Sequence, residues 1–202
     1  MPGNKSVSAP DQAPLHIIHI HAPIIYPSVK SRIYISDIYE DLICQLLDTK
    51  GYFILSYFID QEGQQIYPTA SIVSIEDYDK QASGFWELQV KGQGRVILTN
   101  CNVRGPNPTP INDYLIYNYV DEEFISPEEE ENIKEALQLK LKKNFPNMPP
   151  YLYGELMEDF SIAKFLHYLC FSTKANRDIK IELLSFHSLY ELYQHLIDGF
   201  MK

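Results

Sequence analysis

Cysteine and glycine are scarce in this sequence of 202 residues, which contains three cysteines and nine glycines. The cysteines, Cys44, Cys101 and Cys170, are odd in number, far apart and without a CxxC pair. A disulfide framework would need paired, closely spaced cysteines in a small secreted domain. We therefore interpret them as reduced structural residues and expect a cytoplasmic protein.

Long apolar runs and basic stretches are also missing. No segment is apolar for long enough to span a bilayer, and the polar residues 1–14 predict a flexible leader without the apolar core of a signal peptide. Acidic residues outnumber Lys and Arg by 27 to 17, and the net charge is −10. Nucleic-acid binders gain affinity from basic surfaces that release phosphate counterions. We therefore expect neither a membrane nor a nucleic acid as a partner.

Catalytic motifs are missing as well. The sequence has no P-loop, and the Gly92-x-Gly94 pair lacks the third glycine and the following helix of a dinucleotide site, so it predicts a bend between two strands. Cys170 lies in an apolar helical stripe and is predicted to be a buried thiol. The carboxylates of Glu128–Glu131 fit the first turn of a helix, where the dipole stabilises them. We expect no catalytic residue and no cofactor.

Aromatic residues are abundant, with fifteen tyrosines and ten phenylalanines. In the first half of the chain, short apolar or alternating segments separated by Gly, Pro, Asn and Asp predict strands. The predicted strands cover residues 15–25, 32–35, 52–59, 70–78, 85–91, 95–98 and 114–120. In the hairpin strand 85–91, Trp86, Leu88 and Val90 share one face. One helix, capped by Ser36 or Asp37, is expected to place Ile38, Leu42, Ile43, Leu46 and Leu47 on one apolar stripe.

The second half is predicted to be helical. Ser126-Pro127 opens a helix as N-cap and first residue, and Glu129 is placed to complete a capping box. This helix should end near Asn144, and two further patterns cover residues 160–171 and 177–201, the latter broken near 185–188. The order predicts an α+β fold, with a leader 1–14, a β-rich lobe 15–120 and a helical lobe 121–202.

The order of these segments resembles the N-terminal domain of Lon proteases over roughly residues 15–202. The segments that carry the resemblance are Ala22–Pro27, Ile38–Leu47, Gly51–Leu55, Ala70–Ile75, Gly84–Ile97 and Ile179–Leu192. The resemblance implies a PUA-like β-rich pseudo-barrel with one helix, followed by a helical bundle. It also implies a non-catalytic domain for substrate recognition, because the ATPase and Ser-Lys protease domains of Lon would lie beyond Lys202.

Three positions depart from the family's pattern. Ser28 stands where the family usually has glycine after the proline. Ile35–Tyr39 replaces a Phe-Glu-x-Arg-Tyr stretch, and Thr69 replaces the glycine that commonly opens the central hairpin. The chain is therefore interpreted as a divergent member.

Two sets of residues are candidates for binding. The first set consists of tyrosines near the expected lobe junction: Tyr114, Tyr117, Tyr119, Tyr151 and Tyr153. Tyrosine provides a large contact area to a partner at little cost in side-chain entropy. They predict a surface for unfolded or apolar protein segments, with a separate protease as a further partner if the chain is an adaptor. Packing between the lobes is the alternative role for these rings.

The second set is His16, His19 and His21. On a strand, His19 and His21 point to the same face, a spacing that a metal could use. Further ligands would have to come from Cys44, Cys101 or His167 through folding. A small metal-dependent enzyme or ligand-binding protein is therefore the alternative function, and a polar strand face is the structural alternative. His187 and His195, eight residues apart on the last helical pattern, are expected to be structural.

Overall fold

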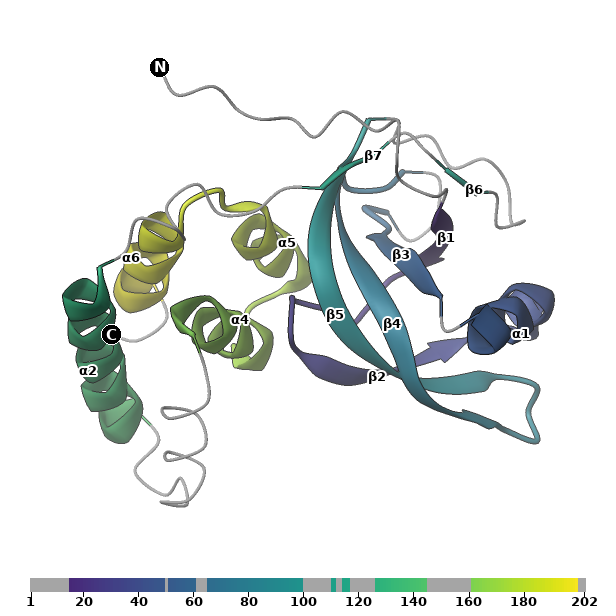
Figure 1. Ribbon diagram of the computed structural model, residues 1–202, viewed down its shortest axis with the longest axis horizontal. Helices are drawn as coiled ribbons and strands as arrows, with labels where there is room; N and C mark the ends of the chain where they lie inside the picture. The colour runs from purple at the N-terminus through teal and green to yellow at the C-terminus, as the bar shows by residue number, and fades with distance from the viewer. Residues whose placement is uncertain are drawn as a thin grey trace. The chain divides into compact units, whose positions relative to one another are not determined.

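The computed structural model describes residues 15–49, 51–60, 65–99, 110–111, 114–116, 126–144 and 161–199. The chain divides into two compact units, Met1–Tyr117 and Asn118–Lys202. Among the described residues, all strands and one α-helix belong to the first unit, and the remaining α-helices belong to the second (Figure 1). The fold class is thus α+β, and the prediction from the sequence is confirmed.

The strands of the first unit form one mixed sheet. Its order is β2-β5-β4-β3-β1-β6, and β7 pairs with β5 off this path. The strands are β1 (Leu15–Ile20), β2 (Lys30–Ile35), β3 (Tyr52–Tyr57), β4 (Thr69–Lys80), β5 (Trp86–Leu98), β6 (Pro110–Ile111) and β7 (Tyr114–Ile116). The pair β1–β3 is parallel, and the other pairs are antiparallel. The two long strands β4 and β5 form a curved hairpin that extends beyond the rest of the sheet (Figure 1).

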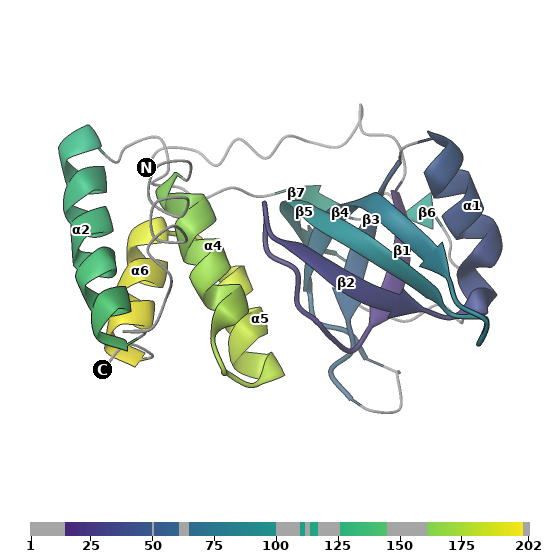
Figure 2. The same ribbon diagram turned by 90° about the horizontal axis from the view of Figure 1, so that it is seen from below.

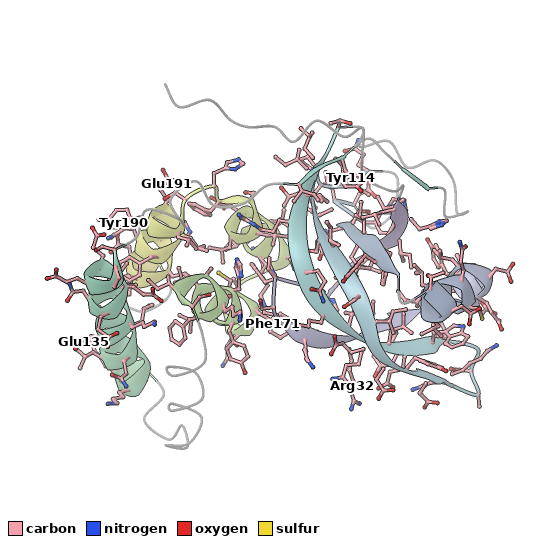
Figure 3. The ribbon with its side chains drawn as sticks, viewed as in Figure 1. Arg32, Tyr114, Glu135, Phe171, Tyr190 and Glu191 are labelled. Atoms are coloured by element: carbon pink, nitrogen blue, oxygen red, sulfur yellow. The ribbon has the colours of Figure 1, made fainter. Side chains whose placement is uncertain are left out.

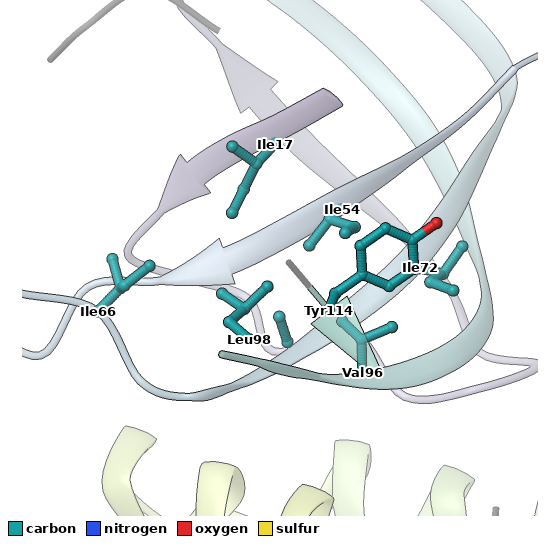
Figure 4. Packing of buried hydrophobic residues seen from close by; sticks show 8 residues of the cluster. Ile17, Ile54, Ile66, Ile72, Val96, Leu98 and Tyr114 are labelled. Atoms are coloured by element: carbon teal, nitrogen blue, oxygen red, sulfur yellow. The ribbon is translucent and has the colours of Figure 1, made fainter. Parts of the chain in front are cut away.

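The core of this unit contains side chains from most of the strands. One cluster of buried residues comprises Ile17, Ile54, Ile66, Ala70, Ile72, Val96, Leu98 and Tyr114 (Figure 4). The predicted face of the hairpin strand is also correct, since Trp86, Leu88 and Val90 are all buried. Thr69–Val73 are buried without a break, so this half of β4 is covered on both faces.

The predicted irregularity at Gly92–Gly94 is present as a register shift that leaves Gln93 without a pairing partner on β4, but the predicted division into two strands is wrong. Strand β5 runs without interruption from Trp86 to Leu98. Gly92 is needed there because another segment crosses it: a Cβ on Gly92 would overlap the Tyr26 carbonyl oxygen and lie 2.7 Å from the carbonyl carbon. The missing side chain therefore admits a close approach of backbone, beside the register shift in the strand. The predicted turn also begins later, since β4 continues to Lys80.

The segment after β2 forms a 3₁₀ turn (η1, Asp37–Tyr39) and then helix α1 (Glu40–Thr49). Ser36 is the N-cap and accepts a hydrogen bond from the Ile38 amide. Leu42, Ile43 and Leu46 are buried as predicted, but Ile38 is 59% exposed and Tyr39 is buried in its place. The 3₁₀ turn has three residues per turn, so a stripe drawn with the α-helical period fails before α1 begins.

The second unit contains α2 (Pro127–Asn144), α4 (Ile162–Ser172), α5 (Arg177–Ser185) and α6 (Leu189–Gly199), shown side by side in Figure 2. Helix α4 contacts α2, α5 and α6. The capping box is confirmed: the Glu129 amide donates to Ser126 Oγ at 3.2 Å, and the Ser126 amide donates to the Glu129 carboxylate at 3.0 Å. No helix among the described residues combines the length and apolar character needed to cross a membrane.

Candidate binding surface

A buried polar network fixes the connection between β1 and β2, the segment that includes Ala22–Pro27. The Ile25 amide donates to the Tyr57 hydroxyl at 3.0 Å, and Ser71 Oγ donates to the Ile25 carbonyl at 2.5 Å. Because the single Ser71 proton is used there, the Tyr57 hydroxyl is the donor in its 2.8 Å bond to Ser71 Oγ. Burial raises the pKa of Tyr57 to about 12. The neutral phenol is therefore the form that the fold requires.

The same connection rests on β5 through its backbone. The Ser28 amide donates to the Gly92 carbonyl at 2.8 Å, and the Gly92 amide donates to the Val29 carbonyl at 2.9 Å. Ser28 has a φ of 66°, in the left-handed region that favours glycine. This is one of the three places at which the sequence departs from the Lon pattern. The positive φ and the usual glycine at this position both indicate that the backbone conformation, and not the serine hydroxyl, determines which residue fits here.

The histidines of β1 do not form a metal centre with other described residues. His19 and His21 point to one side, as predicted, and both rings pack against Phe58, with centroids 5.5 and 4.9 Å away. His19 Nδ1 also shares a 2.5 Å hydrogen bond with the buried Ser56 hydroxyl. Burial lowers the pKa of both His16 and His19, so neutral rings are favoured. Over the part of the chain that the structure describes, no three His, Cys, Asp or Glu side chains form a group that could hold a metal ion.

Of the candidate tyrosines, only Tyr114 lies within the described residues. Its side chain is 4% exposed and belongs to the core cluster of the first unit (Figure 4). This residue therefore does not offer its ring to a partner, because the ring is packed against Val96 and its neighbours. Tyr117, Tyr119, Tyr151 and Tyr153 lie outside the described residues, and their role in binding stays a prediction.

The remaining reactive candidates lie in both units. Cys170 is fully buried in α4, as its apolar stripe predicts, and His167 is buried on the same helix. His187 is exposed after α5, whereas the His195 ring packs against Phe186 with centroids 5.3 Å apart. Cys44 is exposed on α1, far in sequence from both. The described contacts of Cys170, His167 and His195 are those of buried or packed side chains.

The most exposed apolar side chains of the first unit include Tyr34, Ile38 and Phe85. Their exposed fractions are 59%, 59% and 48%. Ile35 pairs with Trp86 across β2 and β5, and both of these side chains are buried, so Tyr34 and Phe85, their neighbours in sequence, lie on the outer face. Asp37 lies beside Gly84 at the hairpin end, which brings Ile38 to the same edge. We call these three residues the hairpin patch.

A polar hollow of about 190 Å³ lies on the outer face of β2, β5 and β4, next to the hairpin patch. It is lined by Arg32, Asp77, Tyr78, Asp79, Glu87 and Gln89. Arg32 forms a salt bridge of 2.9 Å with Glu87, which also accepts a 2.8 Å hydrogen bond from Gln81. Figure 3 shows Arg32 projecting outward from β2. Exposed aromatics beside a rim of satisfied polar groups are typical of protein-binding surfaces.

Sequence reasoning did not identify this surface. The alternating positions of Lys30, Arg32 and Tyr34 along β2 could have predicted that these three side chains face solvent on one side of the strand. What the alternation alone does not reveal is the pairing of Tyr34 with Glu87 on a strand more than fifty positions away. The hairpin patch follows from that register.

Comparison with solved structures identifies the fold. The chain is similar to a Lon N-terminal domain protein from Xanthomonas campestris, with a TM-score of 0.67 and 15% identity, over 93% of this chain and 99% of the other. It is also similar to the N-terminal domain of the Lon protease of Mycobacterium avium complex, with a TM-score of 0.61 and 14% identity, over 92% of this chain and 97% of the other. The resemblance found in the sequence is therefore confirmed at the level of the fold.

Comparisons of sequence alone find nothing comparable. No family model matches the chain, and no curated protein matches it. The similarity to the two solved structures is therefore one of fold, at 15% and 14% sequence identity.

Proposed function

We propose that this chain, which has the fold of Lon N-terminal domains, is a non-catalytic module that binds unfolded or apolar segments of other proteins. The observation that carries the proposal is the hairpin patch: three large apolar side chains, each of them exposed, on segments that the β2–β5 register and the approach of Asp37 to Gly84 bring to one end of the sheet. Exposed apolar patches rimmed by polar residues are typical of interaction sites. The fold by itself does not assign a function, but substrate recognition is what the Lon resemblance implies.

The geometry of β2 supports an extended ligand. β2 is the end strand of the sheet order, so among the described strands only one of its edges is paired. An extended segment could add to the other edge through backbone hydrogen bonds, and its side chains would then lie beside Tyr34 and Phe85. The charges of Lys30 and Arg32, which are paired with Glu76 and Glu87, protect this edge from self-association in the free protein.

Binding to a permanently unfolded, reduced and carboxymethylated protein tests the proposal. The variant Tyr34→Ser with Phe85→Ser should weaken binding at least tenfold, since loss of interface aromatics costs about 1–2 kcal/mol each. A matched control removes two exposed apolar residues of the helical unit, Leu139→Ser with Tyr168→Ser, which are 70% and 42% exposed. Fluorescence anisotropy measures the affinity, and circular dichroism verifies that both variants are folded. Equal weakening by both variants, or no binding by the unchanged chain, contradicts the proposal.

A role as an adaptor for a separate protease is the more specific form of this function. It predicts that the unchanged chain brings a protease together with an unfolded protein. The Tyr34→Ser, Phe85→Ser variant should not do so, because it does not hold the unfolded protein. Addition of the purified chain to an extract should then accelerate degradation of the labelled unfolded protein. If the chain binds the unfolded protein but leaves its degradation rate unchanged, the adaptor role is wrong and the binding function stands.

A further inference from the structure

Helix α2 has an apolar side chain on each of two opposite faces. Leu137 is fully buried, whereas Leu139 is 70% exposed, the largest exposed fraction of any large apolar side chain among the described residues. Two residues advance a helix by about 200°, so Leu137 faces the helices of its own unit and Leu139 faces away from them. Figure 2 shows α4 and α6 on one side of α2. The core of the helical unit therefore does not account for Leu139.

The exposed leucine lies between two opposite charges. Glu135 and Lys143 stand four positions before and after Leu139, and both are exposed. Figure 3 shows Glu135 projecting outward from α2. In the part of α2 that the structure describes, Glu130 pairs with Lys134 at 3.0 Å, but neither Glu135 nor Lys143 makes an ion pair within the chain. We call Glu135, Leu139 and Lys143 the α2 row.

The α2 row is complementary to itself. Residues four apart on a helix form the ridges with which helices most often pack on one another. If two copies of α2 cross at Leu139 in opposite directions, each Glu135 lies at the same level as Lys143 of the second copy, about 6 Å along the axis from the leucine. A parallel crossing would instead bring glutamate to glutamate and lysine to lysine. The order of the charges therefore selects the antiparallel arrangement.

We propose that the α2 row binds the α2 row of a second copy of this chain. The two helices cross antiparallel, with Leu139 of each copy at the two-fold axis and a Glu135–Lys143 ion pair on either side of it. Such an interface uses the same surface on both copies and closes at two. Because it is small, the dimer is weak and reversible. The row belongs to the helical unit, so this inference is independent of the proposed function.

Exchange of the charges tests the proposal with the full chain. The Glu135→Lys variant has only lysines at the ends of its row, and the Lys143→Glu variant has only glutamates. Each variant alone would place like charges together in a dimer, whereas a dimer with one copy of each variant has both ion pairs restored. The double variant, Glu135→Lys with Lys143→Glu, also restores both pairs. Sedimentation velocity over a series of concentrations measures the dimer in each sample.

Matched controls make the same changes of charge elsewhere in the helical unit. Lys164→Glu on α4 and Glu182→Lys on α5 alter exposed residues outside the α2 row. Leu139→Ser removes the apolar centre of the row without a change of charge, so it tests the interface even if a charge variant is poorly folded. Circular dichroism verifies the helix content of every variant.

The unchanged chain should form a dimer whose dissociation constant rises at least tenfold in each single charge variant and in Leu139→Ser. The equimolar mixture of the two charge variants and the double variant should dimerise within about threefold of the unchanged chain, and the controls on α4 and α5 should not differ from it. A chain that stays monomeric at all concentrations would overturn the proposal. Single charge variants that dimerise like the unchanged chain, or a mixture that stays monomeric, would overturn it as well.

These outcomes remain separate from those of the proposed function. Leu139→Ser should lose the dimer, but its affinity for the unfolded protein should not change when it is measured at concentrations at which the chain is monomeric. Loss of the dimer with binding retained, or loss of binding with the dimer retained, then identifies which of the two surfaces has failed.

Discussion

Replacement of Gly92 by alanine should destabilise the first unit strongly. A Cβ at this position would overlap the Tyr26 carbonyl oxygen and would lie 3.1 Å from Pro27 Cα. Both neighbours are backbone atoms, so they cannot move away by a change of rotamer. The connection between β1 and β2 would have to shift off β5 to make room.

The cost of that shift can be estimated from the contacts that it breaks. The hydrogen bonds of Gly92 with Ser28 and Val29 contribute about 1 kcal/mol each. Ile25 and Tyr26, which are fully buried, would be displaced from a packed core, which costs about 1–3 kcal/mol. Loss of glycine's freedom in the unfolded chain returns less than about 1 kcal/mol. The net destabilisation should be about 2–5 kcal/mol.

Urea unfolding followed by tryptophan fluorescence measures this directly. The chain has one tryptophan, Trp86, which is buried on the same strand and therefore reports on the first unit. Gly94→Ala is the matched control, because its Cβ would meet only Ile72 Cδ1 at 3.8 Å, an ordinary contact. If the two variants have the same midpoint and the same m-value, the close approach over Gly92 is not what requires glycine.

Three other substitutions test the local arguments. Tyr57→Phe should reduce the alkaline loss of stability: the folded pKa of about 12 lies above the ordinary value of 10.0, so the contribution is complete below pH 10 and is lost between about pH 10 and 12, by about 2–3 kcal/mol. Urea midpoints at pH 8 and pH 11 measure about half of this loss, because pH 11 lies midway between the two pKa values. The exposed Tyr52→Phe is a control that should follow the unchanged chain. Ser28→Gly should raise the free energy of unfolding by about 0.5–1 kcal/mol, because glycine adopts the φ of 66° without steric cost, and Ser28→Ala should give no such gain. Ser126→Ala should lower the helix signal in circular dichroism at a cost of about 1 kcal/mol, whereas Ser126→Thr should retain most of it.

Features that depend on neighbouring residues in sequence could be predicted. The capping box of Ser126 and Glu129 is such a case, because both partners lie within one helical turn. The face shared by Trp86, Leu88 and Val90 is another, since strand alternation alone defines it. The order of strands and helices was also sufficient for the α+β class.

Features that depend on a distant partner could not be predicted. Gly92 and Gly94 have the local pattern of a break between strands, and only the pairing with β4 on both sides of Gln93 shows that one strand continues through them. Tyr114 looks like a surface aromatic until β7 pairs with β5 and places the ring in the core. The hairpin patch has the same origin, because the β2–β5 register brings Tyr34 and Phe85 to one face. A single sequence contains the residues of such sites but not the pairing that assembles them.

Hydrogen–deuterium exchange in the presence of an unfolded protein tests the central claim most directly. With an excess of the reduced, carboxymethylated protein, amides of Lys30–Ile35 and of the β5 residues paired with them should exchange more slowly. The Tyr34→Ser, Phe85→Ser variant should show no such slowing under the same conditions. Protection confined to other strands or to the helical unit, with β2 unaffected, would contradict the assignment of the hairpin patch as the binding surface.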